Sequence, residues 1–274
     1  MQKTQKNTQT IITTVKNSTI SAYDRGLNYG DGFFTTAKVV NGQVEHWSHH
    51  KARLIECAAR LGFPLVDIAE LEAHIAKSIA EHTLCVLKIV ITRGEGGRGY
   101  GLPQTCNVTV LLSVLEYPQN YSRLANEGIS LNISPIKLAA QPLLAGLKTL
   151  NRLEQVLIKK ALQTQPCDDV LVLDYNNNVI EASAANIIAI KQNKLFTPSL
   201  NECGIKGVYL QSLCDKLAVD FKCVSIADLL EADAVFICNS LMGVVPVNRL
   251  EQRSFDIVHS QLLLNKLLAK EAKC

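Results

Sequence analysis

The sequence predicts an α+β / α/β protein that folds as two domains. A chain of 274 residues is long enough for two modest domains, each with its own core. In the first part, a hairpin signal precedes two helical patterns and two buried strands, whereas helical patterns and short apolar strands follow one another in the second. We expect an N-terminal α+β domain over residues 1–115, a connecting strand and interdomain loop over residues 116–142, and a C-terminal domain over residues 143–274.

A β-hairpin is the first expected element, because Asn41-Gly42 is a strong signal for a two-residue turn. Gly62-Phe63-Pro64 separates two helical patterns, and runs rich in Val, Ile and Leu predict buried strands after them. In chain order, the expected elements are strands at residues 33–40 and 43–47, helices at 49–61 and 68–81, and strands at 85–93 and 106–115.

The second part follows a polar crossing at residues 117–127. Ala140-Gln141-Pro142 indicates a loop, and Asn176-Asn177-Asn178 predicts a turn because asparagine tolerates left-handed backbone angles. In chain order, the expected elements are a strand at residues 129–136, a helix at 152–163, strands at 169–173, 179–190 and 194–197, a helix at 206–219, a strand at 234–238 and a helix at 256–269.

Composition excludes several classes of protein. The net charge of +3 is not concentrated in a basic run, so nucleic acid is not an expected partner. No apolar stretch approaches the roughly 18 residues that a membrane span needs, and we expect the polar start Met1–Asn7 to be a short frayed tail, not a secretory signal. The nine cysteines occur singly, which indicates buried thiols in a reducing cytoplasm, and no histidine or cysteine spacing predicts a metal site.

The segment Gly94-Glu95-Gly96-Gly97-Arg98-Gly99 matches the dinucleotide-binding pattern G-x-G-x-x-G. That fingerprint must open a helix whose N-terminus holds the pyrophosphate, and Tyr100–Pro103 cannot start a regular helix well. We therefore reject the dinucleotide interpretation. Two others stay open, namely a flexible loop that presents Arg98 to an anionic substrate and a solvated glycine-rich hairpin.

Lys148 is the main candidate for covalent chemistry. It has apolar neighbours on both sides, so partial desolvation could lower its pKa and supply a neutral amine. Such an amine attacks a carbonyl carbon in Schiff-base chemistry. Asn151 and Glu154 have the spacing of a capping box for the helix that follows. The alternative is an ordinary lysine with an apolar stem and a solvated tip.

A phosphate-bearing cofactor is suggested by further segments. Glu181 lies in a nearly apolar strand-turn-strand, where a buried carboxylate needs a cation or a strong donor such as a protonated pyridine nitrogen. The Gly204–Val208 helix start, Asn239-Ser240 and Arg53 could each bind a phosphate. Each also has an ordinary interpretation, as a solvated strand edge, a cap, a turn or a surface charge.

Five segments, taken together and in order, resemble the fold type IV pyridoxal 5'-phosphate enzymes. This family includes D-amino acid and branched-chain aminotransferases and aminodeoxychorismate lyase, and the Phe-Thr-Thr ending of the first segment resembles the lyase. The segments are Tyr23–Thr36, Thr92–Tyr100, Leu147–Val156, Glu181–Asn186 and Ile237–Pro246. The resemblance implies a two-domain, D-amino acid aminotransferase-like architecture and a homodimer with the site near its interface.

Residue by residue, the resemblance implies Lys148 as the Schiff-base lysine for pyridoxal 5'-phosphate and Glu181 as the partner of its pyridine nitrogen. The other implied cofactor contacts are Arg53, Asn186, Gly207, Val208, Asn239 and Ser240. The implied substrate-side residues are Tyr29, Arg98 and, as a catalytic group, Thr36. Thr35 and Thr36 lie on opposite faces of the expected strand, so only one of them can face the pocket.

The reaction implied by the resemblance is a carbon–oxygen lyase reaction of folate biosynthesis. 4-Amino-4-deoxychorismate would lose its enolpyruvyl group as pyruvate and become 4-aminobenzoate, with Lys148 as general base. Aromatisation favours the elimination, so the protein mainly positions the reactants. An aminodeoxychorismate synthase would supply the substrate. Two alternatives remain, namely a D-amino acid or branched-chain aminotransferase of the same fold and a binding or structural protein without catalysis.

Overall fold

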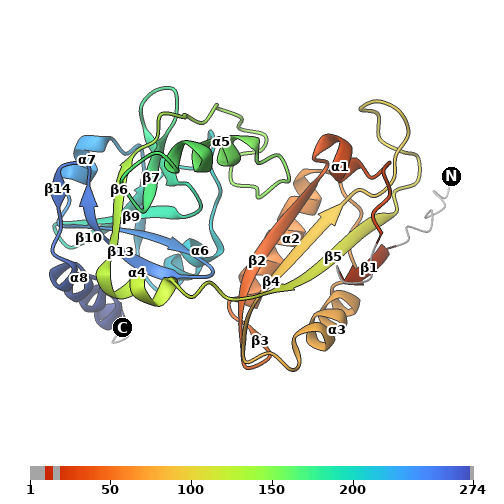
Figure 1. Ribbon diagram of the computed structural model, residues 1–274, viewed down its shortest axis with the longest axis horizontal. Coiled ribbons are helices and arrows are strands. Elements are labelled where there is room, and N and C mark those ends of the chain that lie inside the picture. The colour runs from red at the N-terminus through yellow and green to blue at the C-terminus, as the bar shows by residue number, and fades with distance from the viewer. Residues whose placement is uncertain (1–9, 15–18, 272–274) are drawn as a thin grey trace. The chain divides into compact units, whose positions relative to one another are not determined.

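Residues 10–14 and 19–271 are described in the computed structural model (Figure 1). The frayed tail expected at Met1–Asn7 lies outside the described residues. The chain divides into two compact units. The first comprises Met1–Tyr117 and Lys148–Asn151, and the second comprises Pro118–Leu147 and Arg152–Cys274. The segment that carries Lys148 therefore belongs to the first unit, although its flanking residues belong to the second.

The first unit is built on a five-stranded sheet. The order of its strands is β1 (Thr10–Thr14), β5 (Val108–Leu115), β4 (Leu84–Thr92), β2 (Gly32–Val40) and β3 (Gln43–Val44). β1 pairs with β5 in parallel and the other neighbours are antiparallel. The helices of this unit are α1 (Arg25–Tyr29), α2 (Trp47–Arg60) and α3 (Ile68–Ile79). The unit thus combines these three helices with a mainly antiparallel sheet.

Side chains alternate between the two faces of β2. Phe33, Thr35, Ala37 and Val39 are buried, whereas the residues between them are partly exposed. The hairpin after β2 is confirmed, since Asn41 and Gly42 have φ angles of 49° and 69°. Such left-handed angles suit a type I′ turn, which matches the twist of the two strands. The alternation decides which residues of β2 can contribute to a site.

The second unit is built on a nine-stranded sheet. Its order is β11 (Val219–Lys222), β10 (Lys194–Pro198), β9 (Asn186–Lys191), β12 (Ala234–Asn239), β13 (Gly243–Leu250), β6 (Ile129–Ile133), β7 (Asp169–Leu173) and β8 (Val179–Ala182), with β14 (Arg253–Ser254) paired to β13. Its helices are α4 (Tyr121–Glu127), α5 (Leu153–Leu162), α6 (Val208–Cys214), α7 (Ile226–Leu230) and α8 (Ile257–Glu271). The sheet mixes parallel pairs, such as β6 with β7, and antiparallel ones, such as β9 with β12.

Both faces of the central strands β9 and β12 are buried. Ile187 and Ala189 of β9 pack into one apolar cluster, and Ile188 and Ile190 pack into the other. A strand that is covered on both sides has a continuous apolar sequence, and this pattern predicts such strands from the sequence alone. None of the helices among the described residues is long and apolar enough to cross a membrane.

Several elements differ from the sequence predictions. The strand expected over 179–190 is two strands, β8 and β9, and the helix expected over 206–219 ends at Cys214 and is followed by β11. The polar crossing at 117–127 contains α4, and β13 was not expected. β11 pairs with β10, and β13 pairs with the preceding β12 and with β6, which lies more than a hundred residues earlier. These pairings stabilise strands whose local periodicity does not reveal them.

Candidate active site

The Lys148 segment pairs with β2 inside the first unit. The Phe34 amide donates to the Lys148 carbonyl at 2.9 Å, and the Leu150 amide donates to the Gly32 carbonyl at 2.9 Å. The half-buried Lys148 side chain places its Nζ 4.6 Å from the centroid of the Phe34 ring. An aromatic face is a partly apolar contact for an amine. The β2 pairing therefore fixes the backbone from which the proposed Schiff-base lysine projects.

The capping box expected at Asn151 and Glu154 is wrong. The N-cap of α5 is Arg152, which makes no side-chain cap bond. Asn151 Nδ2 instead donates to the Gly30 carbonyl at 3.2 Å, and Glu154 Oε1 accepts from the Ala139 amide at 3.4 Å. Asn151 therefore ties the Lys148 segment to the end of α1 instead of starting a helix.

Thr35 and Thr36 face opposite sides of the sheet, as expected. Thr35 is fully buried, and its Oγ1 lies 2.6 Å from His50 Nδ1 and 3.5 Å from the donor Arg53 Nη1. Thr36 is partly exposed and shares the face of Phe34, whose ring contacts Lys148. Thr36 is therefore the member of the pair on the face of the Lys148 amine.

Arg53 supplies a buried positive charge on α2. Its side chain is 7% exposed, and burial lowers the pKa of its guanidinium to about 10. Burial, assisted by the Arg53 charge, lowers the pKa of His50 to about 3. At neutral pH Arg53 is thus the cation of this cluster and His50 is neutral. A buried guanidinium is a suitable ligand for a phosphate.

Tyr29 and Arg98 lie in neighbouring parts of the first unit. Tyr29 ends α1, and its ring packs edge-on against Tyr100 with centroids 5.4 Å apart. Arg98 is exposed two residues before Tyr100, in the glycine-rich segment. The element that follows this segment is strand β5 and not a helix, in agreement with rejection of the dinucleotide interpretation.

Glu181 is a buried carboxylate of the second unit. It is 5% exposed on β8, and its Oε2 accepts a hydrogen bond of 2.9 Å from the Ile205 amide. Burial lowers the pKa of Arg152, while the negative charges of Glu181 and Glu154 oppose this shift. Sequence reasoning missed Ile205 and Arg152 as neighbours of Glu181, because no spacing in the sequence connects them.

Asn186 shapes the backbone before α6. Its Nδ2 donates to the Ile205 carbonyl at 2.8 Å, and its Oδ1 accepts from the Gly207 amide at 2.9 Å. A Cβ atom on Gly207 would lie 2.0 Å from Asn186 Oδ1, so this position requires glycine. Since the Gly207 amide is engaged by Asn186, the Val208 amide, which begins α6 and has no acceptor within the helix, is the better donor to an anion.

Asn239 ends β12 and holds the following turn. Its Oδ1 accepts from the amides of Leu241 and Met242, both at 2.9 Å, and its Nδ2 donates to the Ala184 carbonyl at 3.2 Å. The side chain of Asn239 thus organises the backbone that carries Ser240. β12 pairs with β9 so that Cys238 lies opposite Asn186. The second unit therefore gathers Glu181, Asn186, Gly207, Val208, Asn239 and Ser240 around neighbouring strand ends.

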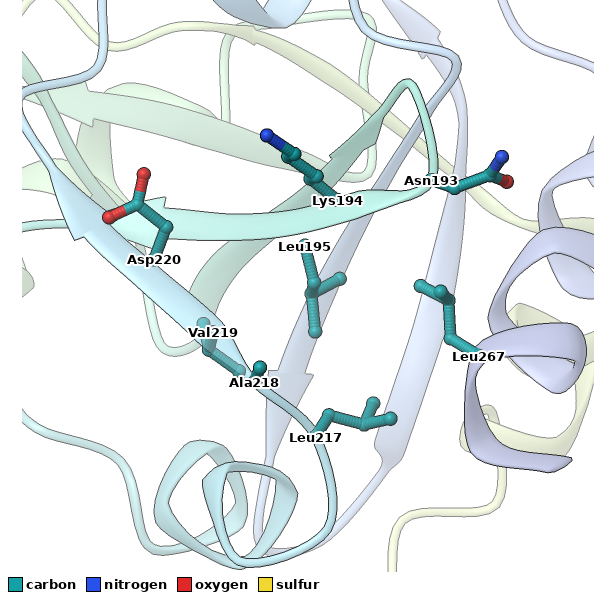
Figure 2. A pocket seen from close by; sticks show the side chains of 8 residues that line it. All are labelled: Asn193, Lys194, Leu195, Leu217, Ala218, Val219, Asp220 and Leu267. Carbon is teal, nitrogen blue, oxygen red and sulfur yellow. The ribbon is translucent and has the colours of Figure 1, made fainter. Parts of the chain in front are cut away.

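A pocket of about 520 Å³ lies elsewhere in the second unit. Figure 2 shows the apolar side chains of Leu195, Leu217 and Leu267 around it. Lys194 and Asp220 are the charged residues in its lining. None of the residues predicted to bind a cofactor or substrate lines this pocket, so it does not belong to the candidate site.

The fold is that of the fold type IV enzymes, a pyridoxal 5'-phosphate class. The family model for amino-transferase class IV matches residues 32–250, and the chain therefore belongs to the amino-transferase class IV family. The predicted fold class is confirmed by this match and by the structural similarity described next.

Three similar proteins refine this family. The aminodeoxychorismate lyase of Vibrio harveyi is 37% identical over 230 residues, which cover 82% of this chain and 85% of that protein. The crystal structure of 4-amino-4-deoxychorismate lyase from Pseudomonas aeruginosa has a TM-score of 0.85 and 36% identity, covering 91% of this chain and 94% of that one. A putative branched-chain-amino-acid aminotransferase of Methanocaldococcus jannaschii is 29% identical, covering 87% of this chain and 85% of that protein.

Proposed function

We propose that this protein is a pyridoxal 5'-phosphate-dependent lyase that converts 4-amino-4-deoxychorismate into 4-aminobenzoate and pyruvate, a step of folate biosynthesis. The observation that carries the proposal is the 37% identity to the Vibrio harveyi lyase over most of the chain. The similarity to the Methanocaldococcus jannaschii aminotransferase is weaker, at 29% identity. An aminotransferase of the same fold is the less supported alternative.

The described residues fit pyridoxal 5'-phosphate. The cofactor needs an amine, an acidic partner for its pyridine nitrogen and donors for its phosphate. Lys148 offers the amine and the buried Glu181 offers the carboxylate. The residues proposed to hold the phosphate directly are Arg53, Val208 and Ser240. Asn186, Gly207 and Asn239 are proposed to contribute indirectly, by shaping the backbone that carries Val208 and Ser240. When bound, the cofactor withdraws electrons from the carbon that carries the substrate's amino group.

Lys148 has two roles in this proposal. It would hold the cofactor as its Schiff-base lysine, and its amine would serve as the general base for the proton on the amine-bearing ring carbon. Loss of this proton lets a ring double bond form as the carbon–oxygen bond to the enolpyruvyl group breaks. The pairing of the Lys148 segment with β2 keeps the amine in place, which is a positioning contribution to the rate.

The substrate-side residues come from the first unit. Arg98 is proposed to pair with a carboxylate of the substrate, and Tyr29 to line the same side. Thr36 is proposed to supply the proton that the leaving enolpyruvyl group needs to become pyruvate. Its place on the Lys148-facing side of β2 supports this role, because Thr35 is committed to His50 on the other side.

The cellular setting belongs to the same proposal. The eight described cysteines are all free thiols, which supports a reducing compartment such as the cytoplasm. An aminodeoxychorismate synthase is proposed to supply the substrate, and the active form is proposed to be a homodimer.

The proposed function is tested by the release of both products from 4-amino-4-deoxychorismate. We expect the wild-type protein to release pyruvate and 4-aminobenzoate in equal amounts, and Lys148→Ala to lose at least about a thousandfold in rate because it removes a covalent and basic group. Absorbance of the bound cofactor would be recorded in parallel.

Lys88→Ala is a matched control for this experiment. Lys88 also places its Nζ over the Phe34 ring, at 5.2 Å, but has no proposed role in catalysis. We expect this variant to retain most of the activity. An equal loss in both variants would assign the effect to the surroundings of Phe34, and it would contradict the role of Lys148.

A further inference from the structure

Arg25 is a buried arginine on a short helix that is otherwise largely exposed. Arg25 is 3% exposed, whereas Leu27 on the same helix is 70% exposed. The Arg25 Nε donates to Asp31 Oδ2 at 2.8 Å, so the carboxylate fixes the plane of the guanidinium. This ion pair leaves the two terminal nitrogens of Arg25 directed elsewhere.

These terminal nitrogens bind the backbone of the glycine-rich loop at residues 94–103. Nη1 donates to the carbonyls of Gly99 and Gly101, at 3.3 and 3.1 Å, and Nη2 donates to the carbonyl of Tyr100 at 3.2 Å. Successive peptide groups are thus held by one rigid, planar donor, a geometry that lysine cannot reproduce. Arg25 therefore anchors the loop through its backbone.

The same guanidinium joins this loop to Tyr29. The Arg25 Cζ lies 5.0 Å from the centroid of the Tyr29 ring, and Tyr29 packs edge-on against Tyr100. Arg98, immediately before the anchored carbonyls, is exposed. Arg25 therefore contacts Tyr29 and also holds the peptide groups that follow Arg98, and both Tyr29 and Arg98 are proposed to contact substrate.

We propose that Arg25 is a positioning residue for substrate, which holds the loop at residues 94–103 in the conformation that packs Tyr100 against Tyr29 and presents Arg98, two residues earlier, to substrate. The loop has glycines at positions 94, 96, 97, 99 and 101. Because glycine permits many backbone conformations, the loop would sample many of them without this anchor. The functional part of this inference rests on the proposed role of Arg98, whereas the anchoring of the loop does not.

Arg93 provides a matched comparison. Its Nε also donates to Asp31 Oδ2 at 2.8 Å and its side chain is equally buried, but its terminal nitrogens bind the carbonyls of Leu61 and Gly62. Arg25 and Arg93 thus share one carboxylate and anchor different segments. A substitution at Arg93 perturbs the charge cluster without removing a bond to the glycine-rich loop.

Limited proteolysis tests the anchor directly. Trypsin cleavage after the exposed Arg98 would be followed by the masses of the two fragments in the cofactor-loaded protein. We expect Arg25→Lys to raise the rate of this cleavage by about tenfold or more, because cleavage tracks the population of the opened loop. Arg93→Lys is expected to leave it within about twofold of wild type. Equal cleavage in wild type and Arg25→Lys, or equal acceleration in both variants, would overturn the proposal.

A pair of glycine substitutions keeps the test valid if Arg25→Lys does not fold. A Cβ on Gly96 would lie 2.5 Å from Arg25 Cδ, whereas a Cβ on Gly97 would have no atom within 4 Å. Gly96→Ala should therefore displace Arg25 and accelerate cleavage, and Gly97→Ala should not. Each rate is divided by that of a synthetic peptide with the same substitution, which removes sequence preferences of trypsin. The absence of a difference between the two variants would contradict the anchor.

Kinetics separate the positioning role from a general loss of structure. We expect Arg25→Lys to raise KM for 4-amino-4-deoxychorismate by about tenfold while kcat changes by less than about threefold, because binding and not chemistry is disturbed. A fall in kcat with unchanged KM would refute the positioning role. If the protein proves not to be a lyase, the proteolysis result still decides whether Arg25 anchors the loop.

Discussion

At the scale of single residues, His50 is the clearest electrostatic feature of the first unit. Its imidazole is fully buried, and among the described residues its Nε2 has no hydrogen-bond partner. Burial and the charge of Arg53 lower its pKa from 6.5 to about 3. The folded protein therefore keeps His50 neutral at pH values where the unfolded chain would protonate it.

This difference predicts a pH-dependent stability. Below about pH 6.5 the unfolded state binds a proton at His50 that the folded state does not, so stability falls as pH falls, by up to about 1.4 kcal/mol per pH unit. His50→Asn removes the titrating group and keeps a polar contact for Thr35. We expect the loss of unfolding free energy between about pH 6.5 and about pH 4.5, measured by urea titration, to be smaller in this variant by roughly 2 kcal/mol.

His74→Asn serves as the control for this titration. His74 lies exposed on α3, so its replacement should leave the pH dependence close to that of wild type. An identical loss of stability in wild type and His50→Asn would show that His50 does not titrate as its burial implies.

At the scale of elements, hydrogen bonds that connect β8, β9 and the start of α6 determine the geometry of the residues proposed to bind the cofactor. Asn186 holds the carbonyl of Ile205 and the amide of Gly207, and the amide of Ile205 in turn holds Glu181. One side chain therefore orients the proposed pyridine partner and the start of α6 together.

Gly207→Ala is expected to weaken cofactor binding. The new Cβ would collide with Asn186 Oδ1 and shift the segment that carries Ile205 and Val208. We expect the Kd for pyridoxal 5'-phosphate to rise by about ten- to a hundredfold, or roughly 1.4–2.7 kcal/mol, as measured by titration of cofactor absorbance. Gly97→Ala, whose Cβ meets no atom within 4 Å, is the control. Equal affinity of both variants would contradict the assignment of this segment to the cofactor.

Local signals made much of the fold predictable. The Asn41-Gly42 turn is predictable because its backbone angles depend on those two residues. The buried strands of the second sheet are predictable because burial on both faces requires a continuous apolar sequence. β13 was missed because Pro246, Asn248 and Arg249 interrupt its apolar pattern, and pairing with β12 and β6 stabilises it.

The candidate site was predictable in its residue types and not in its contacts. The apolar neighbours of Lys148 indicated a special lysine, but only the pairing with β2 places it over Phe34. The capping-box spacing was misleading because Asn151 bonds to Gly30, more than a hundred residues earlier. Contacts of this kind depend on tertiary structure, so no local pattern contains them.

At the scale of the whole molecule, α5 presents an apolar surface to solvent. Leu153, Val156 and Leu157 are 72%, 60% and 44% exposed, and Leu143 before the helix is 80% exposed. An apolar surface of this kind is typical of an interaction site. It supports the proposed homodimer and suggests that α5 contributes to the contact between the two copies.

Charge on this surface is expected to dissociate the dimer. Val156→Glu would place a carboxylate in the proposed contact, so we expect a monomer mass by light scattering at concentrations where wild type is a dimer. Val258→Glu is the control, because Val258 is 66% exposed on α8 and lies outside this surface. Dissociation by the α8 substitution and not by the α5 substitution would refute the proposed interface.

The most direct test of the lyase function compares two reactions of the same cofactor-loaded protein. One is the release of pyruvate and 4-aminobenzoate from 4-amino-4-deoxychorismate, and the other is amino transfer from D-alanine or a branched-chain amino acid to a keto acid. We predict that kcat/KM for product release exceeds that for amino transfer by at least about a hundredfold, equivalent to roughly 2.7 kcal/mol in transition-state stabilisation. Efficient amino transfer without release of 4-aminobenzoate would contradict the lyase assignment and identify the protein as an aminotransferase.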